Sequence, residues 1–283
     1  RIEPTPALSF AVRDLGCTAG ICITASHNPS DYNGYKVYGS DGCQITTEAA
    51  KEIQACINQV DIFSDVKRMP FEEAQEVGLI SYIGEDTLDR YIDAVLALSL
   101  MDGTTSALKV AYTPLHGTGL ECVMRALNGT AIKDVSVVPD QADPNGYFPT
   151  CPYPNPEIQE ALETGIRFCE EEQADLLLAT DPDADRVGVA VRHKGNYELL
   201  TGNEMGILLL DWICRKRSAR GENLEDKVVV TTIVSSAMAD ALAASYGFEL
   251  RRTLTGFKFI GEQIGLLEAE GKADSFMFGF EES

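Results

Sequence analysis

The sequence predicts an α/β protein of three consecutive α/β/α layered domains, with mostly parallel mixed sheets. Two observations support this class. Short apolar strands, loops rich in Gly, Pro or Asp, and amphipathic helices alternate along the whole chain. At 283 residues, 45% of them hydrophobic, the chain is also longer than one ordinary single-core domain. We place the domains at residues 1–104, 105–198 and 199–283, with active loops at the carboxyl ends of strands.

The first domain contains two short predicted strands and a helix. Residues 20–24 form an apolar run that leads into Ala-Ser-His-Asn-Pro. The turn signals Asn28-Pro29 and Asn33-Gly34 separate this run from a second strand at residues 35–38. Apolar residues at helical spacing then predict a helix over residues 47–60.

The second domain begins with a predicted strand over residues 108–113 and the loop Pro-Leu-His-Gly-Thr-Gly at 114–119. Asn155 and Pro156 indicate a helix start, because Pro is favoured at the first helical position. One face of that helix carries Ile158, Leu162, Ile166 and Cys169. A strand over residues 174–179 then runs into an acidic loop.

The third domain opens with a helix start, where Thr201 and Glu204 have the spacing of a capping box. The charged stretch at residues 215–227 predicts a surface loop. Gly247 is expected to end a later helix. The remaining expected elements are a strand at 227–234, a helix at 236–246 and a strand at 275–278.

The composition argues against several classes of function. Lys and Arg number 23 against 44 Asp and Glu, and the net charge of −21 argues against a nucleic-acid or anionic-membrane partner. No apolar run reaches the ~18 residues that a membrane span needs. The chain begins without Met and shows no secretory signal. Its eight cysteines lack a Cys-x-x-Cys pair, which indicates buried free thiols in a reducing cytoplasm.

The loop Thr-Asp-Pro-Asp-Ala-Asp-Arg at residues 180–186 is the strongest chemical signal. Its carboxylates, Asp181, Asp183 and Asp185, stand at alternate positions and can converge on one hard cation. A solvated acidic turn is the plain alternative, but a charge cluster between two apolar strands needs compensation. A calcium EF-hand is excluded because its sixth and twelfth positions would both be Arg here. Magnesium fits better, since it takes few protein carboxylates and leaves room for a phosphate oxygen.

Ser26 and His27 lie in Thr-Ala-Ser-His-Asn-Pro, directly after a predicted strand. The esterase pattern Gly-x-Ser-x-Gly is absent, and taken alone this segment is a turn with local hydrogen bonds. Beside a magnesium loop, however, Ser26 becomes a candidate phosphoryl carrier. Lys36 adds a cation, and the loops Thr-Gly-Phe-Lys at 255–258 and Gly-Phe-Glu-Glu-Ser at 279–283 offer groups suited to sugar hydroxyls and phosphate.

These segments resemble, in the same order, the motifs of the α-D-phosphohexomutase superfamily. The resemblance rests on Gly-Ile-Cys-Ile-Thr-Ala-Ser-His-Asn-Pro, Tyr-Asn-Gly-Tyr-Lys-Val-Tyr, Thr-Asp-Pro-Asp-Ala-Asp-Arg-Val-Gly-Val-Ala-Val, Thr-Gly-Phe-Lys and Gly-Phe-Glu-Glu-Ser, and covers almost the whole chain. The last two segments are closer to the phosphoglucomutase branch than to the phosphomannomutase type. The chain is most similar to the branch of phosphoglucomutase-2-like and phosphopentomutase enzymes.

The resemblance implies a role for each matching residue. The implied metal ligands are Ser26, Asp181, Asp183 and Asp185. The implied catalytic residues are Ser26 as phosphoserine, Lys36 as an acid/base, Arg186 near the phosphoserine, and His27. The implied substrate-binding residues are Thr255, Gly256, Lys258, Glu281 and Ser283.

The implied activity is that of an intramolecular phosphotransferase of the phosphoglucomutase type. Phospho-Ser26 would convert a hexose 1-phosphate, glucose above all, into the 6-phosphate, with Mg²⁺ as cofactor and glucose 1,6-bisphosphate as intermediate and activator. A phosphopentomutase or phosphomannomutase stays open as an alternative. A phosphosugar phosphatase and a catalytically silent sugar-phosphate-binding protein stay open too. The sequence does not indicate the oligomeric state.

The superfamily has four domains around a cleft. Against that pattern, the chain is expected to lack the beginning of the first domain and all of the fourth, phosphate-binding domain. Without them, residues 1–283 are expected to be inactive or weakly active.

Overall fold

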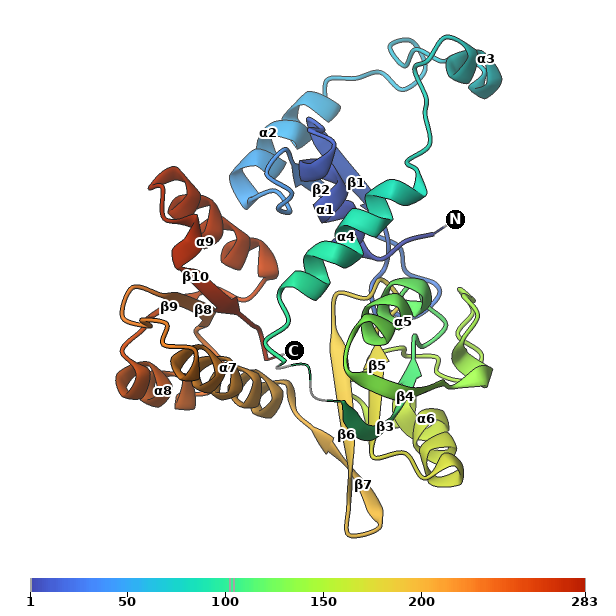
Figure 1. Ribbon diagram of the computed structural model, residues 1–283. Coiled ribbons are helices and arrows are strands. Elements are labelled where there is room, and N and C mark those ends of the chain that lie inside the picture. Colours follow the sequence, from blue (N-terminus) through green and yellow to red (C-terminus); the bar gives the residue numbers. More distant parts are fainter. Residues whose placement is uncertain (1, 102, 104, 283) are drawn as a thin grey trace.

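The computed structural model describes residues 2–101, 103 and 105–282 and contains three successive groups of helices and strands (Figure 1). A sheet with accompanying helices forms each group. The first group is blue to cyan in Figure 1, the second green to yellow, and the third orange to red. The α/β class predicted from the sequence is confirmed.

The first group holds a two-stranded antiparallel sheet of β1 (Ala19–Ile23) and β2 (Tyr35–Gly39). Both strands were predicted from the sequence. Helix α1 (Thr5–Asp14) precedes and packs against this sheet, and α2 (Thr47–Ile57) follows it and ends before the predicted residue 60. The other helices of the group are α3 (Phe71–Glu76) and α4 (Glu85–Ala97).

The second group is built on a five-stranded mixed sheet with the order β4-β3-β5-β6-β7. Strand β3 is parallel to β4 and β5, whereas β6 is antiparallel to β5 and β7. The elements are β3 (Ser106–Thr113), α5 (Leu120–Gly129), β4 (Ile132–Val137), η1 (Pro139–Gln141), α6 (Gln159–Glu172), β5 (Leu176–Thr180), β6 (Val187–His193) and β7 (Asn196–Leu200). A buried core that includes Leu115, Leu162 and Leu177 fixes this sheet and the loops at its edge.

The predicted helix start at residues 155–156 is wrong, because α6 begins at Gln159. The Asn155 side chain accepts a hydrogen bond from the backbone N–H of Glu157 at 3.0 Å. Asn-Pro therefore forms a turn of its own, a conformation that competes with the helix for the same backbone groups. The apolar face predicted for the helix is correct, since Leu162 is fully buried.

The third group is a parallel sheet with the order β10-β8-β9 and three α-helices. The elements are α7 (Gly202–Ala219), β8 (Val228–Thr232), α8 (Met238–Tyr246), β9 (Glu249–Thr253), α9 (Phe257–Ala269), η2 (Ala273–Ser275) and β10 (Phe276–Gly279). The predicted capping box is confirmed, because Thr201 and Glu204 bond each other's backbone N–H groups at the start of α7. Gly247, with φ +86°, ends α8 as predicted.

The surface loop predicted over residues 215–227 is partly wrong, because α7 continues to Ala219. Asp211 and Arg215 form an ion pair one helical turn apart. Such pairs stabilise a helix even where its residues are highly charged. The charged stretch therefore includes the last turn of α7, and the loop is confined to residues 220–227.

The loops singled out in the sequence lie at the carboxyl ends of strands, as predicted. Residues 114–119 follow β3 and residues 181–185 follow β5. Residues 254–256 follow β9, and residues 280–282 follow β10. The fold thus places all four loops at the ends of parallel strands, where α/β proteins hold their ligands.

The composition predicted buried free thiols and no membrane span. All eight cysteines are free, as predicted, but four of them are not buried: Cys17, Cys22, Cys43 and Cys56. Among the helices of the described ranges, none has the length and apolar character needed to cross a membrane.

Candidate active site

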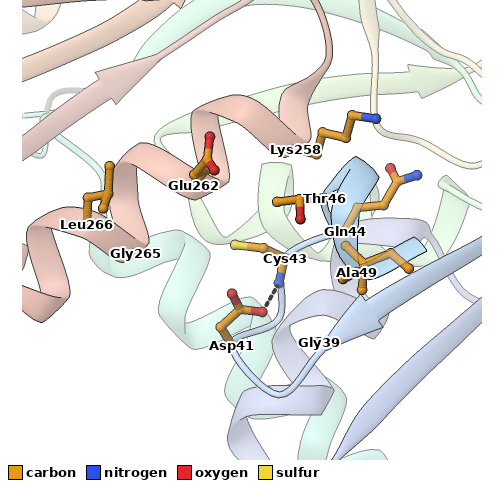
Figure 2. Close-up of a pocket in the computed structure, with 11 residues that line it drawn as sticks. Gly39, Asp41, Cys43, Gln44, Thr46, Ala49, Lys258, Glu262, Gly265 and Leu266 are labelled. Atoms are coloured by element: carbon orange, nitrogen blue, oxygen red, sulfur yellow. Dashed lines mark hydrogen bonds between the residues drawn. The ribbon is translucent and has the colours of Figure 1, made fainter. Parts of the chain in front are cut away.

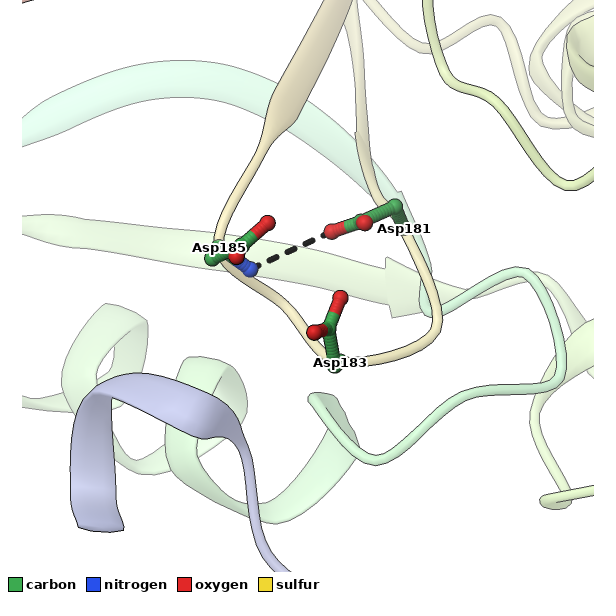
Figure 3. Close-up of side chains that lie close together, drawn as sticks. All are labelled: Asp181, Asp183 and Asp185. Atoms are coloured by element: carbon green, nitrogen blue, oxygen red, sulfur yellow. Dashed lines mark hydrogen bonds between the residues drawn. The ribbon is translucent and has the colours of Figure 1, made fainter. Parts of the chain in front are cut away.

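The three aspartates of the acidic loop converge at the end of β5. Oxygen atoms of Asp181, Asp183 and Asp185 lie within 4.8 Å of one another (Figure 3). Asp181 and Asp183 are buried, whereas the Asp185 side chain is 33% exposed and keeps the cluster open on one side. The sequence predicted this convergence, and the fold produces it.

The loop is shaped by one of its own aspartates. Asp181 Oδ1 accepts hydrogen bonds from the backbone N–H groups of Asp185 and Arg186, both at 3.1 Å. Ala184 has a left-handed backbone conformation with φ +52°, which turns the chain back toward Asp181. Asp181 Oδ1 thus holds the loop through these two hydrogen bonds, and Asp181 Oδ2 is left to contact another segment.

The other oxygen of Asp181 meets Ser26. The Ser26 hydroxyl donates to Asp181 Oδ2 at 2.9 Å, across 155 positions of sequence. Ser26 has φ +52°, and its backbone N–H donates to the Thr24 hydroxyl at 2.8 Å. Gly34 leaves this loop room to fold, because a Cβ there would lie 2.3 Å from the Thr24 carbonyl oxygen. His27 Nδ1 lies 3.2 Å from the Ser26 hydroxyl oxygen.

Lys36, on β2, places its ammonium group in the aspartate cluster. It donates to Asp183 Oδ2 at 2.8 Å and to Asp185 Oδ2 at 3.0 Å. Burial works against the charged form, but hydrogen bonds and charges from Asp183 and Asp185 outweigh it and raise the pKa of Lys36. The lysine is therefore held as a cation beside the carboxylates.

Burial and neighbouring charges shift the pKa values of two aspartates in the cluster, and one carboxylate oxygen of Asp183 receives no hydrogen bond from the described residues. Burial, together with the charges of Asp183 and Asp185, raises the pKa of Asp181. Burial also acts to raise the pKa of Asp183, but its interaction with Asp181 and the hydrogen bond and charge of Lys36 outweigh burial and lower that pKa. Within the described part of the chain, Asp183 Oδ1 is buried and has no hydrogen-bond partner. A buried carboxylate oxygen without a partner is costly, and a cation would satisfy it.

Arg186 and His27 lie beside the cluster. Burial, followed by the charge of Arg186, lowers the pKa of His27. The charge of Arg186 also acts to lower the pKa values of Glu157 and Glu281, although burial raises both. The charge of Arg186 therefore acts both on the serine loop and on a carboxylate of the third group.

Glu281 and Gly256 come together as the two loops of the third group meet. The Gly256 backbone N–H donates to Glu281 Oε1 at 2.5 Å. Glu281 is half-buried, whereas Thr255 is exposed. Ser283, the remaining predicted substrate contact of this loop, lies outside the described residues.

Lys258 faces a separate hollow. It lines a cavity of about 320 Å³ between α9 and the segment that joins β2 to α2, with Asp41, Gln44 and Glu262 among the other lining residues (Figure 2). Its ammonium nitrogen lies 5.1 Å from the centre of the Phe259 ring. None of the clustered aspartates lines this cavity, so the geometry does not join Lys258 to them.

Three sequence profiles of one protein family match the chain in succession. Phosphoglucomutase/phosphomannomutase, alpha/beta/alpha domain I matches residues 1–62, domain II matches residues 89–195 and domain III matches residues 201–283. The chain belongs to the phosphoglucomutase/phosphomannomutase family. The resemblance found in the motifs is confirmed.

Relatives of this phosphoglucomutase/phosphomannomutase family member include two kinds of mutase. A phosphoglucomutase of Staphylococcus epidermidis is 37% identical over 282 residues, which are 99% of this chain and 50% of that protein. A probable phosphoribomutase of Schizosaccharomyces pombe is 38% identical over 275 residues, 95% of this chain and 46% of that protein. The chain thus spans about half the length of the curated relatives it matches.

A solved structure of the same family has a similar fold. The putative phosphomannomutase of Thermus thermophilus matches with a TM-score of 0.75 and 25% identity. The match covers 100% of this chain and 57% of that chain.

Sequence reasoning missed two sets of contacts in this phosphoglucomutase/phosphomannomutase family member. The loop after β3 supports the acidic loop, because the backbone N–H and hydroxyl of Thr118 donate to the Pro182 carbonyl oxygen at 2.8 and 3.0 Å. Glu282 accepts hydrogen bonds from the hydroxyls of Thr232 and Ser235, both at 2.7 Å. The loop at residues 114–119 was noted in the sequence, but no sequence pattern indicated that it contacts the acidic loop.

The contact at Pro182 predicts a large effect at Gly117. A Cβ at Gly117 would lie 2.3 Å from Pro182 Cα and 2.5 Å from its carbonyl oxygen, so Gly117→Ala must displace backbone. We expect this variant to lose about 1–3 kcal/mol of unfolding free energy and, at the magnesium site predicted from the sequence, to bind Mg²⁺ about tenfold more weakly. Urea unfolding and isothermal titration calorimetry measure the two effects.

Gly146→Ala is the matched control, because a Cβ at Gly146 meets no atom within 4 Å. This variant should behave like the wild type in both measurements. Equal stability and affinity in Gly117→Ala would show that the loop after β3 does not fix the acidic loop.

Proposed function

We propose that the chain carries the phosphoryl-transfer site of a phosphosugar mutase that interconverts glucose 1-phosphate and glucose 6-phosphate. The observation that carries this proposal is the Ser26 hydroxyl, 2.9 Å from a carboxylate oxygen of Asp181 within a cluster of three aspartates. A serine in this place can take up a phosphoryl group where a bound cation would offset the added charge. The membership of the family and the names of the relatives support the same reaction class.

Magnesium fits the residues of the cluster. The donors are all oxygens, and Asp183 Oδ1 is a buried acceptor that receives no hydrogen bond from the described residues. Mg²⁺ prefers oxygen ligands and is held by few carboxylates. We propose that the residues that hold it are Ser26, Asp181, Asp183 and Asp185. When bound, Mg²⁺ would neutralise charge that develops on the transferred phosphoryl group.

In the proposed reaction Ser26 gives one phosphoryl group to the sugar and receives another phosphoryl group from it. The bond between phosphorus and Ser26 Oγ breaks as the 6-hydroxyl oxygen of glucose 1-phosphate bonds to phosphorus and loses its proton. Glucose 1,6-bisphosphate results. In the return step Ser26 Oγ bonds to the phosphorus of the 1-phosphate while the bond from that phosphorus to the 1-oxygen breaks, and the 1-oxygen takes up a proton to give glucose 6-phosphate. We assign Arg186 to charge stabilisation and His27, 3.2 Å from the serine oxygen, to orientation of that oxygen. Lys36, a cation in the free site, is assigned to give a proton to the departing 1-oxygen of the sugar and, once neutral, to accept the proton of the attacking 6-hydroxyl in the next cycle.

The third group is proposed to hold the sugar. The half-buried Glu281, bonded to the Gly256 N–H and influenced by the charge of Arg186, is the best-supported contact. The exposed Thr255 would contact the sugar from the same loop. Lys258 and Ser283 keep this role from the resemblance alone. The proposed domains remain residues 1–104, 105–198 and 199–283, which bear the serine, metal and sugar loops in that order.

A pentose phosphate is the second candidate substrate, because a relative as similar as the phosphoglucomutase is named a probable phosphoribomutase. Both substrates present a primary hydroxyl and an anomeric phosphate, so the Ser26 chemistry would be the same. The choice between them depends on contacts to the sugar ring.

The proposed function is tested by the phosphate that Ser26 retains. The protein is incubated with Mg²⁺ and either glucose 1,6-bisphosphate or ribose 1,5-bisphosphate, and its intact mass and phosphopeptides are measured. We expect one added phosphate, located on Ser26, and faster uptake from the glucose compound. Release of inorganic phosphate without a retained phosphate would favour a phosphatase, and uptake of phosphate at a residue other than Ser26 would contradict the proposal.

A further inference from the structure

We infer that Thr5 is a positioning residue of the metal site: its hydroxyl fixes the Asp183 carboxylate so that one oxygen is left free for the cation. This inference rests on the proposed function, because it concerns the same magnesium site. Thr5 is the first residue of α1, a helix of the first group, whereas Asp183 belongs to the loop after β5 in the second.

Two hydrogen bonds join these residues across 178 positions of sequence. The Thr5 hydroxyl donates to Asp183 Oδ2 at 3.1 Å, and the Thr5 backbone N–H donates to the Asp183 carbonyl oxygen at 2.9 Å. Thr5 is buried, so water competes little for either bond. The backbone bond fixes where Asp183 stands, and the hydroxyl bond fixes how its carboxylate is turned.

The two oxygens of Asp183 are used unequally as a result. Oδ2 accepts hydrogen bonds from Thr5 and from the Lys36 ammonium at 2.8 Å. Oδ1 is buried and has no such partner among the residues that the structure describes. A carboxylate held by two donors on one oxygen presents the other oxygen in a fixed direction. Partners of this kind orient metal ligands and tune their affinity.

The Thr5 hydroxyl does not cap its own helix. The N-cap of α1 is Pro4, and no side chain caps that end. The other neighbour of the hydroxyl is Cys22 Sγ at 3.4 Å, and a thiol is only a weak hydrogen-bond partner. A purely structural link between α1 and the acidic loop is the competing explanation. It predicts a loss of stability in Thr5 variants and no change in metal affinity once they are folded.

The test is the affinity for Mg²⁺, measured by isothermal titration calorimetry on the wild type, Thr5→Val, Thr5→Ala and Thr5→Ser. Thr5→Val keeps the shape and the backbone N–H but removes the hydroxyl. We expect it to bind Mg²⁺ about tenfold more weakly, and Thr5→Ser, which restores the hydroxyl, to bind like the wild type. Thr5→Ala serves if the extra methyl group of Val prevents folding, and the thermal midpoint without metal reports folding for each variant.

Thr87→Val is the matched control, because Thr87 is also a buried threonine in the first turn of a helix, α4, and bonds Arg90 instead of the acidic loop. It should leave the Mg²⁺ affinity unchanged. In an Asp183→Asn background, Thr5→Val should cause little further loss, since its effect passes through Asp183.

The outcomes separate the two proposals. Wild-type affinity in folded Thr5→Val and Thr5→Ala, or a loss that Thr5→Ser does not restore, would overturn the positioning role and leave the metal site intact. A fully additive loss in the double variant with Asp183→Asn would overturn it as well. Absence of Mg²⁺ binding by the wild type would overturn the proposed site itself, and the role of Thr5 with it.

Discussion

Ser26→Ala should retain no phosphate after incubation with glucose 1,6-bisphosphate and Mg²⁺. The substitution removes the only oxygen of the Ser26 side chain, the atom that would bond to phosphorus, and it leaves the Asp181 carboxylate, 2.9 Å away in the wild type, in place. Any mutase turnover of the protein should fall to background, because the proposed cycle needs the Ser26 oxygen as donor and acceptor of the phosphoryl group. Intact mass, phosphopeptide mapping and a coupled mutase assay measure these effects.

The fold should survive this change. Ser26 is only half-buried, and alanine removes a single oxygen from its loop. Ser30→Ala is the control within the same loop, because Ser30 is exposed, and it should take up phosphate like the wild type. Wild-type phosphate uptake by Ser26→Ala would contradict the assignment of the carrier.

Asp183→Asn should weaken Mg²⁺ binding by at least about 100-fold, since a ligand itself should matter more than the neighbours that orient it. The change removes a negative charge and one anionic oxygen, Oδ1, that the protein leaves without a hydrogen bond among its described residues. It also removes the ion pair of Asp183 with Lys36 at 2.8 Å. Calorimetric titration with Mg²⁺ and with Ca²⁺ measures the affinity and the selectivity for the smaller ion.

Turnover at fixed Mg²⁺ should fall with the affinity and recover in part at high Mg²⁺. Asp143→Asn removes the same charge from an exposed position of the second group and should change neither quantity. If Asp183→Asn needs no more Mg²⁺ than the wild type, the acidic loop is a structural turn and not a metal site.

Local sequence patterns predicted those parts of the fold whose physical causes are local. The capping box of Thr201 and Glu204 and the helix stop at Gly247 depend on neighbouring residues and were found where expected. The errors came where two local signals compete. Asn155 formed a side-chain turn in place of a helix cap. The charged residues 215–227 began inside a helix because Asp211 and Arg215 pair along its surface.

The candidate site, like the fold, was predicted only in part. The spacing of Asp181, Asp183 and Asp185 in one loop was sufficient to predict that their carboxylates converge. Ser26 was paired with that loop as a candidate phosphoryl carrier, and the resemblance to a family supported the pairing, because neither segment by itself indicates the other. The structure places the two within hydrogen-bond distance, and the role of the serine remains a proposal.

The sequence by itself therefore determined the α/β class, several strands and a few helix ends, the aspartate cluster and the family. Only the tertiary structure decided which atoms face one another. Thr5 reaches Asp183 across 178 positions, and Gly117 packs against the backbone of Pro182. Hydrogen bonds and steric contacts act over a few ångströms, and residues so far apart in the chain meet only because separate sheets and helices pack together. For that reason the free oxygen of Asp183 could not be identified until the fold was known.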